Sequence, residues 1–192
     1  MYFLIFISFL LISVIAKNDS GFNKDILNEH NRLRQLHGVP DLKLDDELSK
    51  GCQAYAEELA VKDKMVHSKG ANNGEFGENL AFRTHDLLHC VQSWYDEIEL
   101  YNFKKGGYQK GTGHFTAVVW KATTRLGVGH KKNEVSKKVY IVARYLPTGN
   151  VIGLFAKNVP KPLNSTCRSG NLNEFTFGLV LIFAWLLNKF LA

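Results

Sequence analysis

The chain has 192 residues, of which 45% are hydrophobic and 12% aromatic, and its formal net charge is +6. This length suits one domain with a substantial core, and this apolar content excludes an intrinsically disordered chain. The basic excess lies in separated lysines outside any nucleic-acid-binding motif, so no nucleic-acid partner is expected, although such lysines can favour anionic lipid or glycan surfaces. They are Lys104 and Lys105, Lys110, Lys131 and Lys132, and Lys137 and Lys138.

The first segment, residues 1–16, is almost wholly apolar. Val14 and Ala16 are small enough for the −3 and −1 positions of a signal-peptidase site, which predicts a signal peptide cleaved after Ala16. An uncleaved signal anchor is the less favoured alternative, because the segment is short for a bilayer that needs about 20 residues. We therefore expect the chain to enter the secretory pathway.

Two amphipathic helices are predicted next. Residues 25–36 place apolar side chains and His30 at helical spacing, and Gly38 and Pro40 end the pattern. A second helix begins at the acidic residues 45–47, which favour a helix N-terminus. One stripe of this helix carries Leu48, Cys52, Tyr55 and Leu59.

The middle of the chain alternates loops with shorter elements. Residues 67–81 are rich in Gly and Asn and are predicted as a loop, after which Thr84 caps a third helix whose buried side runs from Leu87 to Tyr101. Residues 115–120 are too short for periodicity to decide between helix and strand. Strands are predicted at 126–129 and 138–145, which gives an α+β fold of helices against a small antiparallel sheet.

The last segment, residues 164–192, consists of a polar spacer and a hydrophobic tail. Its unbroken apolar stretch, 177–187, has 11 residues, or about 16 Å of helix against a hydrocarbon core of about 30 Å. This favours a GPI-attachment signal with its small residues at 164–166. A retained membrane tail, in which Lys189 reaches the far headgroups, is the alternative. Both alternatives leave residues 17–163 as the folded domain, anchored at the membrane.

The chain has three cysteines. Cleavage near Asn164 or Ser165 would remove Cys167 and leave Cys52 and Cys90 in an oxidising compartment, where they can form a disulfide. Two buried free thiols are an equally open alternative, because the sequence does not show whether the two residues approach closely enough.

Several motifs taken together resemble the CAP superfamily, which comprises cysteine-rich secretory proteins, antigen 5 and pathogenesis-related proteins. Their order and intervals match over residues 22–162, and the Golgi-associated pathogenesis-related type is the most similar branch, although that type has no signal peptide. The resemblance implies an α-β-α sandwich with a small antiparallel sheet between helices. The motifs are 30–34, 76–81, 94–103, 111–121 with 126–129, and 142–150.

The resemblance also implies a central cleft that holds His67, Glu78, Glu97 and His114. Two imidazoles and two carboxylates suit a borderline divalent metal such as zinc. The alternative is a metal-free network in which each histidine donates to a glutamate. No residue is assigned as catalytic; a metal-dependent hydrolase with Glu78 or Glu97 as general base is the rival function.

A binding function is expected, in a secreted or cell-surface module with this cleft and an apolar groove. The family suggests a lipid or sterol in the groove, lined by some of the aromatic residues, although core packing is their default role. Protein or glycan partners and a homodimer are further expectations. The aromatic residues are Trp94, Tyr95, Tyr101, Phe103, Tyr108 and Trp120.

A second histidine pair, His85 and His89, has a spacing that puts both residues on one face of a helix. This pair could hold a metal, but exposure to solvent is the favoured interpretation.

Overall fold

The computed structural model describes residues 21–163. The signal peptide expected at 1–16 and the tail expected at 164–192 lie outside this range. Within it, no helix is both long and apolar enough to cross a bilayer.

The two amphipathic helices of the first half are confirmed. Residues 21–35 are helical and are followed by a turn at 36–38, where Gly38 takes a φ of 63°. Helix α2 covers Asp46–Lys62, and the Asp45 side chain accepts a hydrogen bond from the Leu48 amide at 2.9 Å. This cap, with Asp46 and Glu47 in the first turn, stabilises the positive end of the helix dipole.

Four strands form one sheet in the order β1-β3-β4-β2. They are β1 (Lys43–Leu44), β2 (Gly77–Arg83), β3 (Arg125–Lys132) and β4 (Val139–Leu146). The last two confirm the predicted strands. The sheet is mixed, because β1 runs parallel to β3 while the other pairs are antiparallel. The predicted small antiparallel sheet is thus present in β2, β4 and β3, and the parallel strand β1 is an addition that the sequence did not indicate, since two residues are too few to show an alternating pattern.

Strand β2 occupies part of the segment that was predicted as a loop. Its first residues are polar, yet Glu78 and Asn79 are both buried. Their polar side-chain atoms form hydrogen bonds with protein groups elsewhere in the chain. A buried strand is therefore possible here, although its polar sequence is typical of a solvent-exposed loop. The short helix α3, Lys69–Asn72, lies in the same segment.

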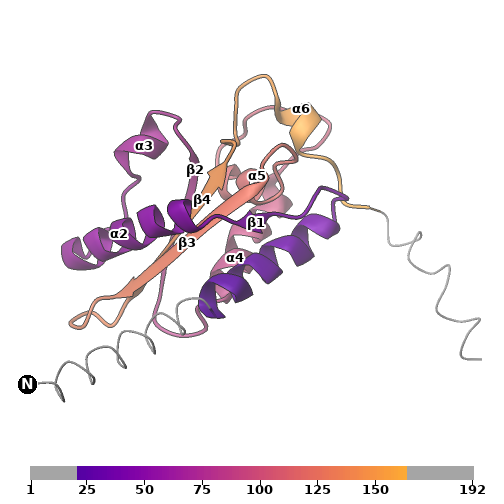
Figure 1. Ribbon diagram of the computed structural model, residues 1–192. Coiled ribbons are helices and arrows are strands. Elements are labelled where there is room, and N and C mark those ends of the chain that lie inside the picture. The colour runs from indigo at the N-terminus through magenta and orange to yellow at the C-terminus, as the bar shows by residue number, and fades with distance from the viewer. Residues whose placement is uncertain (1–20, 164–192) are drawn as a thin grey trace, which may run out of the picture. The chain divides into compact units, whose positions relative to one another are not determined.

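Helices cover both faces of the sheet, as Figure 1 shows. On one face, α2 packs Cys52, Ala56 and Leu59 against Tyr140 and Val142 of β4. On the other face, the intervening residues of β4 join the larger core, which also contains side chains of the N-terminal helix 21–35 and of α4 and α5. These intervening residues are Ile141, Ala143 and Tyr145.

Two glycines allow α2 to lie directly on β3. A Cβ atom at Gly127 would stand 2.6 Å from the Leu48 carbonyl carbon, and one at Gly129 would stand 2.2 Å from the Gln53 nitrogen. Both distances are shorter than a non-bonded contact permits, so only glycine fits at these positions.

The predicted third helix is shorter than expected and begins later. Helix α4 covers His89–Tyr95 and continues as the 3₁₀ helix η1, Asp96–Leu100. Thr84 is not its cap, because Asp86 takes a φ of 45° and breaks the helical path. His85 therefore precedes α4 and shares no helical turn with His89.

Two further short helices complete the fold. Helix α5, Gly113–Val118, shows that most of the undecided segment 115–120 is helical. Helix α6, Phe155–Asn158, follows the loop after β4.

The structure gives Cys52 and Cys90 as buried free thiols. They belong to different core clusters, one on each face of the sheet. Because the sheet lies between them, the fold offers no geometry for the disulfide alternative.

Candidate functional site

The first pair of candidate residues is His67 and Glu78. His67 Nδ1 lies 3.1 Å from Glu78 Oε1, and His67 keeps 47% of its side chain exposed while the Glu78 carboxylate is fully buried. Glu78 also accepts hydrogen bonds from the Ser68 amide at 2.9 Å, the Ser68 hydroxyl at 2.8 Å and Arg144 Nε at 3.0 Å. The carboxylate therefore has four donors and a compensating positive charge.

The second pair is Glu97 and His114. Glu97 Oε1 lies 2.7 Å from His114 Nδ1, and Glu97 Oε2 accepts from the His114 amide at 2.8 Å and the Phe115 amide at 3.1 Å. Glu97, on η1, thus caps the start of α5 and holds the imidazole ring at the same time. The His114 ring also stacks on Trp94, with centroids 6.5 Å apart.

Strand β2 connects the two pairs. Glu78 holds His67, and the next residue, Asn79, donates from Nδ2 to the His114 carbonyl oxygen at 3.1 Å. Adjacent strand residues point to opposite faces, so one strand serves both pairs.

A cavity of about 410 Å³ opens beside the first pair. It is lined by His67, Phe76, Glu78, Ala117, Asn150 and Val151, among others. Asn150 donates to the Gly113 carbonyl at 2.9 Å and accepts from the Thr116 hydroxyl at 2.6 Å, which fixes the loop after β4 against α5. His114 is not among the residues that line this cavity, although the lining residue Ala117 follows it by three positions on α5.

Both carboxylates are poor bases in this arrangement. Burial acts to raise the pKa of Glu78, but hydrogen bonds from His67, Ser68 and Arg144 outweigh it and hold the pKa below its usual value. Burial likewise acts to raise the pKa of Glu97, and the interactions with His114 and the Phe115 amide outweigh it. A general base needs a pKa near the working pH, so the geometry gives the hydrolase alternative no support.

The structure does not gather the four residues as four metal ligands. Across residues 21–163, no three His, Cys, Asp or Glu side chains come close enough together to hold a metal ion. The carboxylate oxygens of both glutamates accept hydrogen bonds from protein donors. His67 Nε2 and His114 Nε2, in contrast, have no hydrogen-bond partner in the described range.

The aromatic residues named from the sequence are mainly core. Trp94, Tyr95, Tyr101 and Trp120 are buried and Phe103 packs against them, while Tyr108 is exposed. They cannot form an open apolar groove. Exposed apolar side chains lie elsewhere, at Met65 and Val66 just before His67, and at Ile152 and Leu154 just after the cavity residue Val151.

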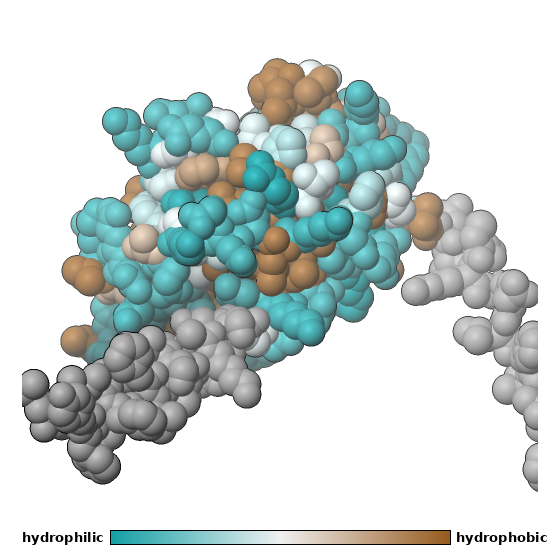
Figure 2. All heavy atoms as spheres, in the orientation of Figure 1, coloured by the Kyte–Doolittle hydropathy of each residue, from teal (hydrophilic) through white to brown (hydrophobic). Residues whose placement is uncertain are grey.

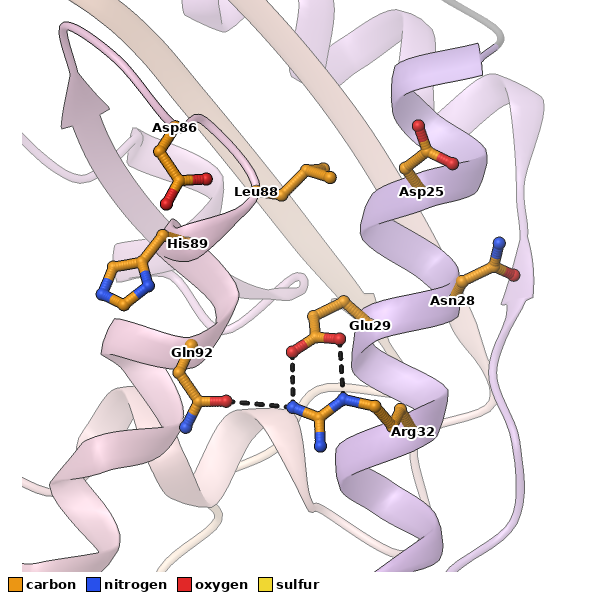
Figure 3. Close-up of a pocket in the computed structure, with 8 residues that line it drawn as sticks. All are labelled: Asp25, Asn28, Glu29, Arg32, Asp86, Leu88, His89 and Gln92. Atoms are coloured by element: carbon orange, nitrogen blue, oxygen red, sulfur yellow. Dashed lines mark hydrogen bonds and ion pairs between the residues drawn. The ribbon is translucent and has the colours of Figure 1, made fainter.

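A second hollow, of about 460 Å³, lies between the N-terminal helix and the start of α4 (Figure 3) and contains none of the four candidate residues. At its base Arg32 binds Glu29 at 2.6 Å and donates to Gln92 at 3.0 Å, which ties the helix to α4. Asp25 and Asp86 face it from opposite sides. His89 lines this hollow but His85 does not.

Sequence reasoning missed Arg144 and Asn79 as parts of the site. Arg144 is 9% exposed, and it is the one charged residue within the apolar run 139–146. A buried charge needs a partner of opposite charge. A lone arginine within an apolar strand therefore indicated that a buried acidic partner exists. Asn79 had no such signal beyond its place next to Glu78.

Comparison with known proteins agrees with this fold. The model of the CAP, or cysteine-rich secretory protein, family matches residues 27–145. Human Golgi-associated plant pathogenesis-related protein 1 is 44% identical over 145 residues, which cover 73% of this chain and 94% of that protein.

Solved structures show the same architecture. Schistosoma mansoni venom allergen-like protein 4 superposes with a TM-score of 0.58 at 22% identity, over 73% of this chain and 95% of that one. The structure of NaASP2 with Zn²⁺ gives a TM-score of 0.54 at 20% identity, over 79% and 91%. The extent of the family match and the identity to the human relative establish that this chain belongs to the CAP family, among its pathogenesis-related members.

Proposed function

We propose that the chain is an extracellular or cell-surface binding module, and that its ligand site is the cleft at His67 and His114. The observation that carries this proposal is the state of the two imidazoles. Each ring has its Nδ1 next to a glutamate and its Nε2 without a partner among residues 21–163. The extracellular location rests on the signal peptide and the anchor expected from the sequence.

A divalent metal such as zinc is the first proposed ligand. A histidine that binds a metal through Nε2 commonly donates its Nδ1 proton to a carboxylate, which fixes the tautomer. His67 and His114 fit this pattern, with Glu78 and Glu97 as the supporting carboxylates rather than ligands. When bound, zinc would supply a positive charge and open coordination positions for a further ligand.

A lipid or sterol is the second proposed ligand. Exposed apolar side chains adjoin the cavity residues in the sequence: Met65 and Val66 directly precede His67, and Ile152 and Leu154 follow Val151. Figure 2 shows hydrophobic side chains gathered over the loop that leads from β4 to α6. An amphiphile could place its polar end near the imidazoles and its apolar part on this rim.

Titration calorimetry with zinc chloride tests the metal proposal. The wild type should bind zinc, and His67→Ala and His114→Ala should each weaken binding by about tenfold or more, since each removes one of two imidazole ligands. His85→Ala is the matched control, because His85 is exposed, lies outside the cleft, and its ring hydrogen-bonds the Thr84 hydroxyl rather than either glutamate. Unchanged binding in both cleft variants would refute the metal site.

Lipid extraction and mass spectrometry of the purified protein test the second ligand. Sterol or fatty acid should be recovered from the wild type and reduced in Ile152→Ser, whose side chain is 76% exposed and therefore unimportant for folding. Recovery from neither protein, with no competition by added sterol, would exclude lipid as the ligand.

A further inference from the structure

A series of hydrogen bonds, two buried and one partly buried, leads from His30 to His114. His30 Nε2 lies 2.9 Å from the Tyr145 hydroxyl, which lies 3.1 Å from Asn79 Nδ2. The same Asn79 nitrogen lies 3.1 Å from the His114 carbonyl oxygen. The four residues come from the N-terminal helix, β4, β2 and α5, and the first three are almost completely buried.

The direction of each hydrogen bond follows from the chemistry of the groups. His30 Nδ1 is 2.8 Å from the Ile26 carbonyl, which can only accept, so Nδ1 carries the proton. Burial lowers the pKa of His30 to about 4, so the ring is neutral and its Nε2 accepts from the Tyr145 hydroxyl. The Tyr145 oxygen and the His114 carbonyl then accept the two protons of the Asn79 amide.

His114 is consequently held at three atoms. Glu97 holds its amide nitrogen and its ring Nδ1, and Asn79 holds its carbonyl oxygen. Only the ring Nε2 is left for a ligand. We propose that Asn79 and Tyr145 are positioning residues for His114, with His30 as the terminal acceptor that orients the Tyr145 hydroxyl.

This inference rests on the proposed function only for its ligand, because the position of the ring can be observed without one. His67 provides an internal reference, since its contacts involve Glu78 rather than Asn79 or Tyr145. Tyr140 provides a matched control, because it is another buried tyrosine of β4. Its hydroxyl donates to Asp63 at 2.6 Å and takes no part in the hydrogen bonds between His30 and His114.

The test uses protein labelled with ¹⁵N-histidine, and compares wild type with Tyr145→Phe, Asn79→Asp and Tyr140→Phe. The ring spectrum of His114 should show the Nδ1–H tautomer in wild type and a shifted, averaged signal in Tyr145→Phe. The effect should be larger in Asn79→Asp, which replaces the donor with an acceptor. Signals of His67 should stay unchanged in Tyr145→Phe, and Tyr140→Phe should leave His114 as in wild type.

Zinc affinity provides the second readout. Tyr145→Phe should weaken binding by about tenfold, as expected when a supporting partner of a ligand is lost, while Tyr140→Phe should not. An unchanged His114 signal in both Tyr145→Phe and Asn79→Asp would overturn the inference. An equal change at His67 and His114 would overturn it too, because it would indicate general loosening. Absence of zinc binding in wild type would refute the metal site instead, and the ring spectra would still decide the positioning role.

Discussion

Glu78 and Arg144 stand directly opposite each other in the β2–β4 register and form a buried ion pair, with Arg144 Nε 3.0 Å from Glu78 Oε2. The guanidinium carbon also lies 5.2 Å from the centre of the Tyr55 ring and 4.2 Å from that of Phe76. The charge that neutralises Glu78 is therefore part of the packed interface between α2 and the sheet, so the same carboxylate that orients His67 also contributes to folding.

Replacing Glu78 with glutamine should be strongly destabilising. The change leaves the Arg144 charge buried without a counter-charge, which typically costs about 3–5 kcal/mol. Glu97→Gln should cost less, about 1–2 kcal/mol, because Glu97 is 21% exposed and its amide oxygen can still accept from α5. Guanidinium chloride unfolding of both variants measures the difference, and equal losses would contradict the structural role of the ion pair.

Acid should destabilise the protein through His30. Burial lowers the pKa of His30 from 6.5 to about 4, a difference worth about 3 kcal/mol. Between pH 6.5 and about 4, His30 is protonated in the unfolded chain but remains neutral in the folded protein. Its contribution to stability is therefore complete above pH 6.5 and is lost as the pH falls to about 4. Unfolding free energies at pH 7, 5.5 and 4.5 should fall less steeply in His30→Gln than in wild type.

Protonation of Glu78, Glu97 and His37 also lowers the free energy of unfolding as the pH falls, because the pKa of each group is lower in the folded protein than in the unfolded chain. The informative quantity is thus the difference in slope between wild type and His30→Gln. His85→Gln serves as the control, and parallel curves for all three proteins would contradict the prediction.

Arg34 should be needed for folding although no acidic side chain within residues 21–163 forms an ion pair with it. Its guanidinium is fully buried and donates to the carbonyl oxygens of Pro40, Val118, Trp120 and Thr123 at 2.8–3.0 Å. Arg34→Met would leave several of these carbonyls buried without a donor, at a cost of about 3–5 kcal/mol. Arg32→Met, at an exposed ion pair, should cost less than about 1 kcal/mol in the same unfolding experiment.

The contact of α2 with β3 should not tolerate a methyl group. Gly129→Ala places a Cβ atom 2.2 Å from backbone of α2, and the required displacement should cost more than about 4 kcal/mol or prevent folding. Gly21→Ala is the control, because a Cβ atom there meets nothing within 4 Å. Soluble yield and thermal melting of the two variants measure the effect, and similar melting temperatures would contradict it.

The two buried cysteines, Cys52 and Cys90, should be unreactive towards alkylating reagents in the folded protein. Burial raises the pKa of both the Cys52 and the Cys90 thiol to about 12, so the reactive thiolate is scarce at pH 8. Iodoacetamide should label neither residue in the native state and both after denaturation without reductant. Absence of labelling in the denatured, unreduced protein would instead reveal a disulfide.

The predictable parts of the fold are those whose own sequence carries an apolar pattern. The helix at 21–35 and α2 show this as apolar residues at helical spacing. Strands β3 and β4 were instead recognisable as apolar runs joined by a polar turn, and β4 is buried along almost its whole length. Strand β2 breaks this rule, because Glu78 and Asn79 point inward. Their partners, Arg144 and Tyr145, lie more than sixty residues later in the chain, and no local pattern reports such a pairing.

The start of α4 and the pairing of the candidate histidines and glutamates could not be predicted from the sequence for a related reason. Thr84 has the chemistry of a helix cap, but the positive φ of Asp86 delays the helix to His89, and this is set by tertiary packing. Motif resemblance named His67, Glu78, Glu97 and His114 without showing which carboxylate meets which ring. That assignment depends on how β2 and η1 approach the histidines in three dimensions.

The placement of Glu78 and Asn79 next to each other constrains how this chain can vary. Insertion or deletion of a single residue inside β2 would exchange the sides to which the two are directed. Glu78 would then leave His67, and Asn79 would leave the backbone of His114, so the contacts of β2 with both histidines would be lost in one step. Length changes among homologous chains that keep both histidine–glutamate pairs should accordingly fall outside the strand.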